Sequence, residues 1–412
     1  MKIISQNKII KKQHGLLLIL FIYTFFYTDI VKEIIIQNFG INVKLSPIMP
    51  ILIIYCAFKY GRNLFIFWIV LIICSLVLLT GVYRGISIST LFRTFNTTLI
   101  PLVIIGIKIY NPRELINKFI KIFNYIVIIY VLIGCMDYIT HGFFLKILNI
   151  LLKNSYYNKA IGYDLSVGIF RWFSLFGHPL TNSLYMIIFL GLNITYRNIY
   201  KEKYYNIYII YAIALIGTIL SNSKFGIIIT IIILIVNIIN EKNKIIYITS
   251  LIIGGIITIN TSYFERNVII RFKSAILNGD ITNGRMTVLS SLLNYNLYKI
   301  NYFIGNGMSS SDVIVKLIFG SNSGLSNMEI PILMFLYEYG VLVTILMYLI
   351  MILYPIFILI NARKIFAISI VAMIFLFINS FNGMATGTGI LQVYIFTIML
   401  ILNMQKVHSN ND

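Results

Sequence analysis

Charged side chains are scarce in this chain. Asp, Glu, Lys and Arg make up only 11% of its 412 residues, whereas 59% of the residues are hydrophobic and the mean hydropathy is +0.90. A soluble fold has too little interior to hide so much apolar surface. The composition therefore excludes a soluble protein. Apolar runs of about 20 residues, the length that crosses the hydrocarbon of a bilayer as a helix, recur along the sequence.

Cysteine, histidine and the common cofactor motifs are also sparse or missing. Cys56, Cys74 and Cys135 lie in apolar runs without metal-ligand spacing, and the four histidines are scattered, so no metal site is expected. The sequence lacks a Walker A loop, a dinucleotide-binding glycine motif, an HExxH motif and an Asp-x-Asp motif. If the chain is an enzyme, we expect it to need no cofactor, no nucleotide and no metal.

Acidic residues are fewer than basic ones, 13 against 33, which gives a net charge of +20. In a membrane protein with many spans, excess Lys and Arg mostly marks cytoplasmic loops, so we expect no nucleic-acid partner. The sequence predicts an all-α polytopic membrane protein, a single domain over residues 1–412 with an uncleaved first span. About twelve transmembrane helices are expected, centred near residues 24, 52, 72, 99, 128, 185, 212, 231, 252, 347, 373 and 395.

The distribution of positive charge predicts the orientation. If the N-terminus is cytoplasmic, the inner segments carry 18 Lys and Arg residues and the short outer segments carry five. Long translocated loops are largely exempt from this rule, so the comparison of 18 with five decides. Both termini are therefore expected in the cytoplasm. The longest polar segment, 261–327 between spans nine and ten, is expected to form a large extracytoplasmic loop.

Two candidate sites lie at the outer ends of predicted spans. Arg171 begins the stretch Arg171–Pro179, which also contains His178, and it either binds a phosphate through its fork of donors or serves as an interfacial Arg/Trp anchor. Lys224 lies in the turn Ser221–Gly226. That turn either presents several donors to an anion or is a plain hairpin with a snorkelling lysine.

Two further candidates belong to the polar segment and to the span after it. Arg285 follows the turn signal Asn283-Gly284 and should lie in the first turn of a helix, where a cation is unfavourable unless an anionic ligand accompanies it. A solvated surface arginine is the other interpretation. Glu329 forms a capping box with Ser326 or acts as a general base at the membrane edge. Glu338 follows in the same apolar stretch.

The order of the candidate sites along the chain resembles the order of motifs in a known protein family. The chain resembles the O-antigen polymerases (Wzy) and O-antigen ligases, glycosyltransferases of the bacterial envelope. The resemblance covers most of the chain in hydropathy and residues 170–340 in local motifs: Arg171 with Gly177-His178-Pro179, Ser223-Lys224-Phe225-Gly226, Gly284-Arg285, Gly305-Asn306-Gly307, and Glu329 ahead of Glu338-Tyr339-Gly340. In the ligases a His stands where this chain has Glu329, so the resemblance favours a polymerase.

The resemblance implies polymerisation of O-antigen or capsule repeat units. The substrate would be an oligosaccharide carried on undecaprenyl pyrophosphate, at the outer face of the bacterial cytoplasmic membrane, and a protein that regulates chain length is an expected partner. Arg285 and Glu329 are then the expected catalytic residues, the first stabilising charge and the second accepting a proton. Arg171, Lys224, His178 and Glu338 are expected to bind the pyrophosphate or the glycan.

Other classes remain open. A flippase for the same lipid-linked oligosaccharide has a similar length and number of spans, although such transporters usually have paired halves, and here neither half echoes the other. A sugar or ion permease would use Arg171 and Lys224 along its pathway, but it would leave the polar segment unexplained. A purely structural scaffold is a third alternative. Loss of a polymerase leaves single repeat units on the cell surface, whereas loss of a flippase leaves none.

Overall fold

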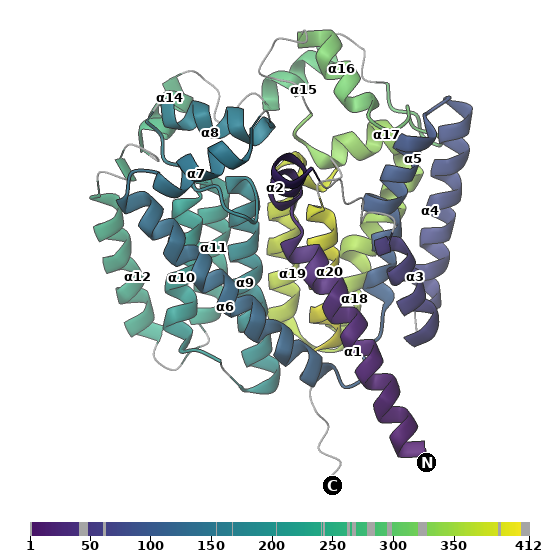
Figure 1. Cartoon of the computed structure of the whole chain (residues 1–412), viewed down its shortest axis with the longest axis horizontal. Helices are drawn as coiled ribbons and strands as arrows, with labels where there is room; N and C mark the ends of the chain where they lie inside the picture. Colours follow the sequence, from purple (N-terminus) through teal and green to yellow (C-terminus); the bar gives the residue numbers. More distant parts are fainter. Residues whose placement is uncertain are drawn as a thin grey trace. The chain divides into compact units, whose positions relative to one another are not determined.

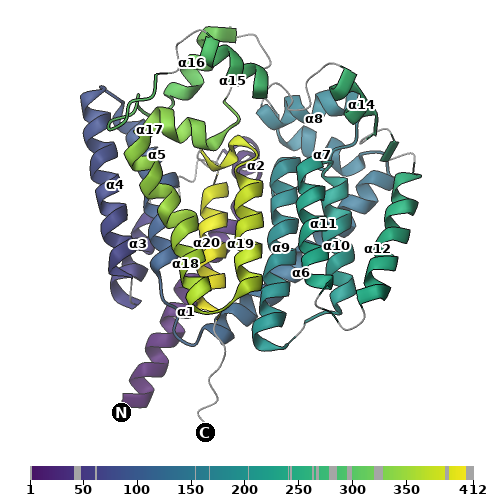
Figure 2. The same cartoon turned by 180° about the vertical axis from the view of Figure 1, so that it is seen from behind.

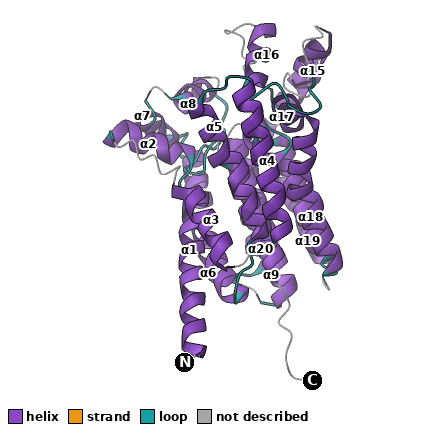
Figure 3. Ribbon diagram, turned by 90° about the vertical axis from the view of Figure 1, so that its right-hand side faces the viewer, coloured by secondary structure: helices purple, strands orange, loops and turns teal. Residues whose placement is uncertain are grey.

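The computed structural model shows an all-helical chain (Figure 3). It describes residues 2–40, 48–60, 63–153, 155–166, 168–202, 204–239, 241, 244–261, 264–265, 269–277, 285–294, 299–319, 328–385 and 389–404. Within these ranges there is no β-strand, and an isolated bridge joins Ser174 to Gly177. The predicted all-α class is confirmed for the described residues.

Several helices are suited to a membrane by length and composition. Four described segments are long and apolar enough to cross a bilayer, and a fifth is added if Ile10–Phe26 and Asp29–Phe39 form one span. The four are α4 (Leu64–Tyr83), the segment Ile88–Gly106, α6 (Pro112–Ile139) and the segment Pro331–Asn361. Each of the twelve expected span centres falls within a helix. The chain is thus a helical membrane protein, while the count of twelve spans stays a prediction.

The chain divides into two compact units (Figures 1 and 2). Unit 1 comprises residues 1–27, 44–119 and 284–412, and unit 2 comprises residues 28–43 and 120–283. Unit 1 contains α1 (Lys2–Phe26), α3 (Ile48–Tyr60), α4, α5 (Ile88–Thr94), η1 (Phe95–Leu99), η2 (Ile100–Gly106), the start of α6, α15 (Arg285–Asn294), α16 (Ser310–Phe319), α17 (Pro331–Tyr348), η4 (Leu349–Leu353), α18 (Tyr354–Asn361), α19 (Ile365–Ile378), η5 (Asn382–Met384) and α20 (Ile390–Asn403).

The 3₁₀ helix η2 lies at the centre of unit 1, where it packs against α3, α4 and α20. Pro101 near its start cannot donate an amide hydrogen bond, and there the chain passes from the π-helix η1 into the 3₁₀ helix. Side chains satisfy the backbone after η2: Asn403 donates to the carbonyl oxygen of Ile107 (3.0 Å) and accepts from the amide of Ile109 (2.9 Å). Gln13 bonds the same stretch. Irregular backbone is tolerated within a membrane only when it is satisfied in this way.

Unit 2 is built around a single buried helix. Its elements are α2 (Asp29–Phe39), the rest of α6, α7 (Phe143–Leu151), α8 (Tyr156–Ser166), α9 (Pro179–Tyr200), α10 (Ile207–Leu220), α11 (Lys224–Ile238), α12 (Lys244–Ile259) and α14 (Ile270–Leu277). Helix α9 packs against α10 and α11 and is buried along most of its length (Figure 2). Asn193 on α9 exchanges two side-chain hydrogen bonds, of 2.7 and 2.8 Å, with Asn124 on α6. This amide pair joins the two helices in an apolar setting.

Short helices lie at one end of unit 2. Helices α2, α7 and α8 share a small hydrophobic core with the segment that precedes α9. The core consists of Ile30, Leu145, Leu148, Leu152, Ile161 and Phe173. Asp137 at the end of α6 accepts hydrogen bonds from the amides of Phe144 (2.7 Å) and Leu145 (3.2 Å), so it satisfies the N-terminus of α7. These contacts fix α7 against the end of α6.

Candidate functional site

The six site residues predicted from the sequence fall into two sets, and each set is described within its own unit. Arg285, Glu329 and Glu338 belong to unit 1. Arg171, His178 and Lys224 belong to unit 2. The polar segment 261–327 is described in part, as α14, α15, α16 and the stretch that precedes α16. The predicted turn at 283–284 and the predicted capping residue at 326 lie outside the described residues.

Arg285 and Glu329 form an ion pair. The Arg285 Nε atom donates to Glu329 Oε2 at 2.9 Å, and the two side chains are 27% and 44% exposed. Arg285 is the first residue of α15, where free backbone amides and the helix dipole favour a negative charge. The sequence left two interpretations of Arg285 open, an anionic ligand at the helix start and a solvated surface arginine. In the structure the anion beside Arg285 is the Glu329 carboxylate.

A hydrophobic cluster positions this ion pair. Val288 and Leu292 on α15 pack with Ile314 and Val315 on α16 and with two methionines, Met328 and Met334. Val288 lies one turn beyond Arg285, and Met328 lies directly before Glu329. Burial of these apolar side chains therefore fixes the backbone on both sides of the pair.

The side chain of Glu338 is buried and caps a neighbouring helix. Its carboxylate accepts a hydrogen bond from the hydroxyl of Ser311, and the backbone amides of Ser309 and Ser311 also bond to it. These groups form the N-terminus of α16, which lacks intrahelical partners for its first amides. The capping carboxylate thus comes from α17, and Glu338 stands 27 positions after Ser311 in the chain. The predicted glycan-binding residue has a structural role that the sequence did not reveal.

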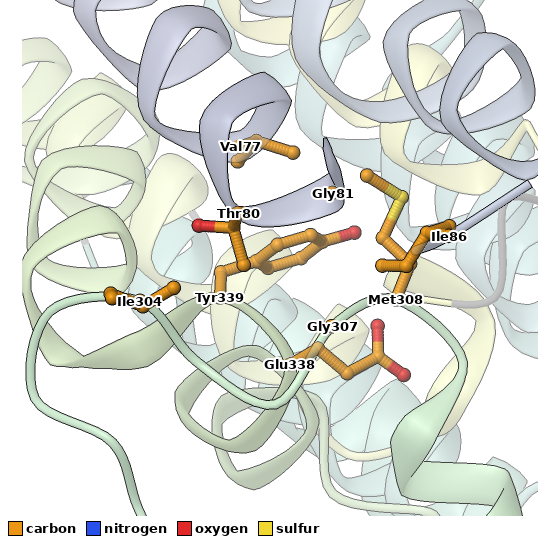
Figure 4. Close-up of a pocket in the computed structure, with 9 residues that line it drawn as sticks. All are labelled: Val77, Thr80, Gly81, Ile86, Ile304, Gly307, Met308, Glu338 and Tyr339. Carbon is orange, nitrogen blue, oxygen red and sulfur yellow. The ribbon is translucent and has the colours of Figure 1, made fainter. Parts of the chain in front are cut away.

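Glu338 also lines a small pocket in unit 1. Figure 4 shows the carboxyl group of Glu338 directed towards Met308, and the ring of Tyr339 also lines the pocket. The lining residues are Val77, Thr80, Gly81, Ile86, Ile304, Gly307, Met308, Glu338 and Tyr339. Most of this lining is apolar, and the carboxylate is already engaged by α16. The pocket therefore offers few free polar groups to a sugar.

The glycine motif Gly305-Asn306-Gly307 packs against α17 beside a break in that helix. Gly340 has non-helical torsions, with φ +82° and ψ 171°, in the middle of that helix. The Gly307 amide donates to the Glu338 carbonyl oxygen at 3.0 Å, and the Asn306 amide donates to that of Tyr337 at 2.8 Å. A Cβ atom at Gly305 would lie 2.3 Å from the Glu338 oxygen. Only glycine permits this approach, so the motif has a structural cause.

In unit 2, Arg171 is paired within the protein. Its Nη1 atom lies 3.7 Å from Asp164 Oδ2 on α8, and its side chain is 21% exposed. The Arg171 Nε atom has no hydrogen-bond partner among the described residues. Arg171 therefore has one buried donor to spare. The sequence reasoning missed Asp164, because no motif connects it to Arg171.

His178 is the N-cap of α9. Its Nδ1 atom accepts a hydrogen bond from the Leu180 amide at 3.3 Å, and its ring contacts the edge of Phe173. Burial, together with the nearby Arg171 charge, lowers the pKa of His178 to about 3. The imidazole is therefore neutral at pH 7, as an Nδ1 acceptor requires. A neutral imidazole contributes no positive charge to bind a pyrophosphate.

Lys224 is the first residue of α11, directly after the turn that joins it to α10. In that turn Ser223 caps α11 by accepting from the Gly226 amide at 3.1 Å, while Ser221 donates to the Gly217 carbonyl oxygen at 2.7 Å. Gly226 faces Ser183 on α9, and a Cβ atom at Gly226 would lie only 2.9 Å from the Ser183 Cβ atom. The two serines thus stabilise the helix ends at this turn, and Lys224 is its positively charged residue.

Two further findings bear on the site, one on metal ligands and one on related proteins. Among the described residues no group of three or more His, Cys, Asp and Glu side chains is arranged to hold a metal ion. Comparison of the chain with protein-family models, with curated proteins and with solved structures gave no match.

Proposed function

We propose that the chain polymerises lipid-linked oligosaccharide repeat units at the outer face of the cytoplasmic membrane. The observation that carries the proposal is the Arg285–Glu329 ion pair. The resemblance to O-antigen polymerases implies that Arg285 is the charge-stabilising cation and Glu329 the base, and these two residues lie within hydrogen-bonding distance although they are 44 positions apart in the chain.

The proposed reaction transfers the growing glycan between two lipid carriers. A hydroxyl oxygen of the incoming unit forms a bond to the anomeric carbon of the growing chain. The bond from that carbon to the pyrophosphate oxygen breaks, and undecaprenyl pyrophosphate leaves. Glu329 accepts the hydroxyl proton, and Arg285 stabilises the negative charge that develops on the pyrophosphate.

The ion pair must open before this reaction. Partly exposed pairs of this kind contribute only about 0–1 kcal/mol, because water screens them. A pyrophosphate carries more negative charge than a carboxylate and binds arginine through several oxygens. It can therefore replace Glu329 on Arg285 at small cost. The substrate would then free the base at the moment when the base is needed.

Polymer length in cells tests the proposal. Arg285→Ala and Glu329→Gln should each replace long glycan by single repeat units on the surface, because loss of a general base costs about 10²–10⁴ in rate. The matched control is Lys273→Ala, which removes an exposed cation from the same polar segment and should leave full-length glycan. A variant without any surface repeat units would indicate the flippase instead.

A charge exchange separates chemistry from packing. The double variant Arg285→Glu with Glu329→Arg can rebuild the pair with its charges reversed, yet it places the base and the cation in exchanged positions. We expect normal protein levels and no polymer. Full-length glycan from this variant would show that the pair is only structural, and the proposed roles would then be abandoned.

A further inference from the structure

Unit 2 contains an apolar pocket between α2, α6, α7 and the segment that precedes α9. Its cavity measures about 210 Å³, which is smaller than the roughly 300–1,000 Å³ of pockets that bury whole drug-sized ligands. The lining residues are Ile34, Tyr130, Ile133, Asp137, Phe144, Ile147, Leu148, Leu151, Trp172, Phe173, Ser174 and Leu175. Ten of these twelve side chains are aliphatic or aromatic, so the pocket suits an apolar ligand.

Apart from the hydroxyl of Tyr130 and the indole N–H of Trp172, the lining has two polar side chains, and both are already engaged. Asp137 accepts from the amides at the start of α7, as described above. The hydroxyl of Ser174 donates to Asn182 Oδ1 at 2.7 Å. A polar ligand would have to compete with these bonds, whereas a hydrocarbon would gain from leaving water without disturbing them.

The pocket adjoins the lipid-facing side of α6. Exposed apolar residues recur along that helix at the spacing of one face: Tyr125, Ile129, Leu132, Met136 and Ile139. Ile133, which lines the pocket, lies about 40° around the helix from Ile129. The apolar surface continues on α7, where Ile147 lines the pocket and is still 41% exposed. Exposed apolar side chains of α6 and α7 therefore lead up to the pocket.

Trp172 forms a fixed wall of this pocket. Its backbone amide donates to the Leu220 carbonyl oxygen at 3.1 Å, and its carbonyl oxygen accepts from Asn182 Nδ2 at 2.6 Å. Its indole packs on Gly134 of α6, where a Cβ atom would lie 2.8 Å from the ring. The wall is thus formed before any ligand binds, which lowers the entropic cost of binding.

We propose that this pocket binds one acyl chain of a membrane phospholipid, which enters from the bilayer between α6 and α7. Phospholipid acyl chains are the most concentrated hydrocarbon around a membrane helix, and binding increases with ligand concentration. The proposal goes beyond the polymerase reaction and does not depend on it, because it uses no residue of the Arg285–Glu329 pair.

Tryptophan fluorescence tests the pocket. The chain has two tryptophans: Trp172 is 2% exposed, whereas Trp68 is 57% exposed. The variant Trp68→Phe leaves Trp172 alone and is reconstituted into phosphatidylglycerol vesicles with or without bromine on the acyl chains. Bromine quenches indole emission at short range, so an acyl chain in the pocket should quench Trp172 strongly. The variant Trp172→Phe reports quenching of Trp68 by the surrounding lipid.

Matched substitutions distinguish the pocket from the bulk lipid. In the Trp68→Phe background, Ile133→Phe narrows the pocket and should reduce the quenching of Trp172 at least twofold. Leu132→Phe adds the same bulk at the adjacent exposed position and should leave the quenching unchanged. Leu151→Phe narrows the pocket from the α7 side and should reduce the quenching of Trp172 as Ile133→Phe does. Agreement between these two variants would show that the reduced quenching does not come from misfolding of one of them.

Three results would overturn the proposal. The first is equal Trp172 emission in brominated and plain vesicles. The second is quenching that Leu132→Phe reduces as much as Ile133→Phe and Leu151→Phe do. The third is relief of the quenching by a few mole per cent of polyprenyl phosphate, which would assign the pocket to an isoprenoid chain. A polymerase that fails the glycan assay would change none of these outcomes, so the two proposals fail separately.

Discussion

At the scale of single residues, His178 connects protonation to folding. Its lowered pKa, about 3, means that the unfolded chain, in which histidine titrates near 6.5, binds the proton first as the pH falls. The free energy of unfolding should therefore decrease once the pH drops below about 6.5. Between pH 6.5 and 5 the loss amounts to about 1–2 kcal/mol.

Thermal unfolding in detergent between pH 7.5 and 5 measures this effect. His178→Asn keeps a side chain that can cap α9 but does not titrate, so it should flatten the dependence of the melting temperature on pH. The exposed His141 is the matched control, and His141→Asn should keep the slope of the parent chain. Equal slopes for His178→Asn and the parent would contradict the assignment.

The site residues show what the sequence could and could not predict at this scale. An arginine at a helix start and a glutamate at a membrane edge are visible in the sequence, because such charges need a physical reason. Their pairing is not visible, because it depends on how α15 and α17 pack. Glu338 is the clearer case: the helix that it caps precedes it by 27 residues, and no local pattern encodes such a cap.

At the scale of elements, the break in α17 is the feature most open to test. Gly340 has φ +82°, and a Cβ atom there would lie 2.7 Å from the Asn301 carbonyl oxygen and 2.9 Å from the Gly305 amide nitrogen. Gly340→Ala should therefore cost about 1–3 kcal/mol of unfolding free energy, because both the torsion and the contact are unfavourable.

The control for this variant lies in α1. Gly15 lies inside a regular helix, and a Cβ atom at this position would have open space around it, with no contact within 4 Å. Gly15→Ala should stabilise the chain slightly, by up to about 1 kcal/mol, because alanine favours helix. Thermal unfolding of both variants under the same conditions measures the difference. A Gly340→Ala variant as stable as the parent would show that the break in α17 is not strained.

Hydropathy predicted the positions of the helices but not their interruptions. The expected centre near 99 falls in the π-helix η1, directly before the 3₁₀ helix η2, and the centre near 347 falls in α17, which breaks at Gly340. These interruptions depend on partners distant in the sequence: α20 bonds the backbone after η2, and residues 301–307 occupy the break at Gly340. The hydrophobic period of a sequence predicts one helix at a time, whereas these interruptions depend on contacts with segments distant in the sequence.

At the scale of the whole molecule, some of the helices at expected spans are shorter than a bilayer core. Helix α10 has 14 residues, which corresponds to about 21 Å, less than the roughly 30 Å of a bilayer core. A span this short requires thinning of the bilayer or flanking residues that extend the crossing. Composition therefore assigns the membrane class, and chemical labelling of the loops locates the crossings.

The orientation of the chain is the property of the whole molecule that charge predicts most directly. The excess of Lys and Arg on the expected inner segments predicts that Lys108 lies in the cytoplasm and that Lys316, in the polar segment, lies outside. Both side chains are exposed, so each position can carry a label. With Cys56, Cys74 and Cys135 replaced by Ala, single variants Lys108→Cys and Lys316→Cys are treated with a maleimide that does not cross membranes.

We expect Lys316→Cys to be labelled in intact cells and Lys108→Cys only after the membrane has been opened. The two positions belong to the same unit, so one preparation of folded protein serves both. The reverse pattern would place Arg285 and Glu329 with the polar segment in the cytoplasm, where the proposed lipid-linked donor is absent. The orientation therefore decides whether the ion pair can meet its substrate, independently of whether the two residues perform the chemistry.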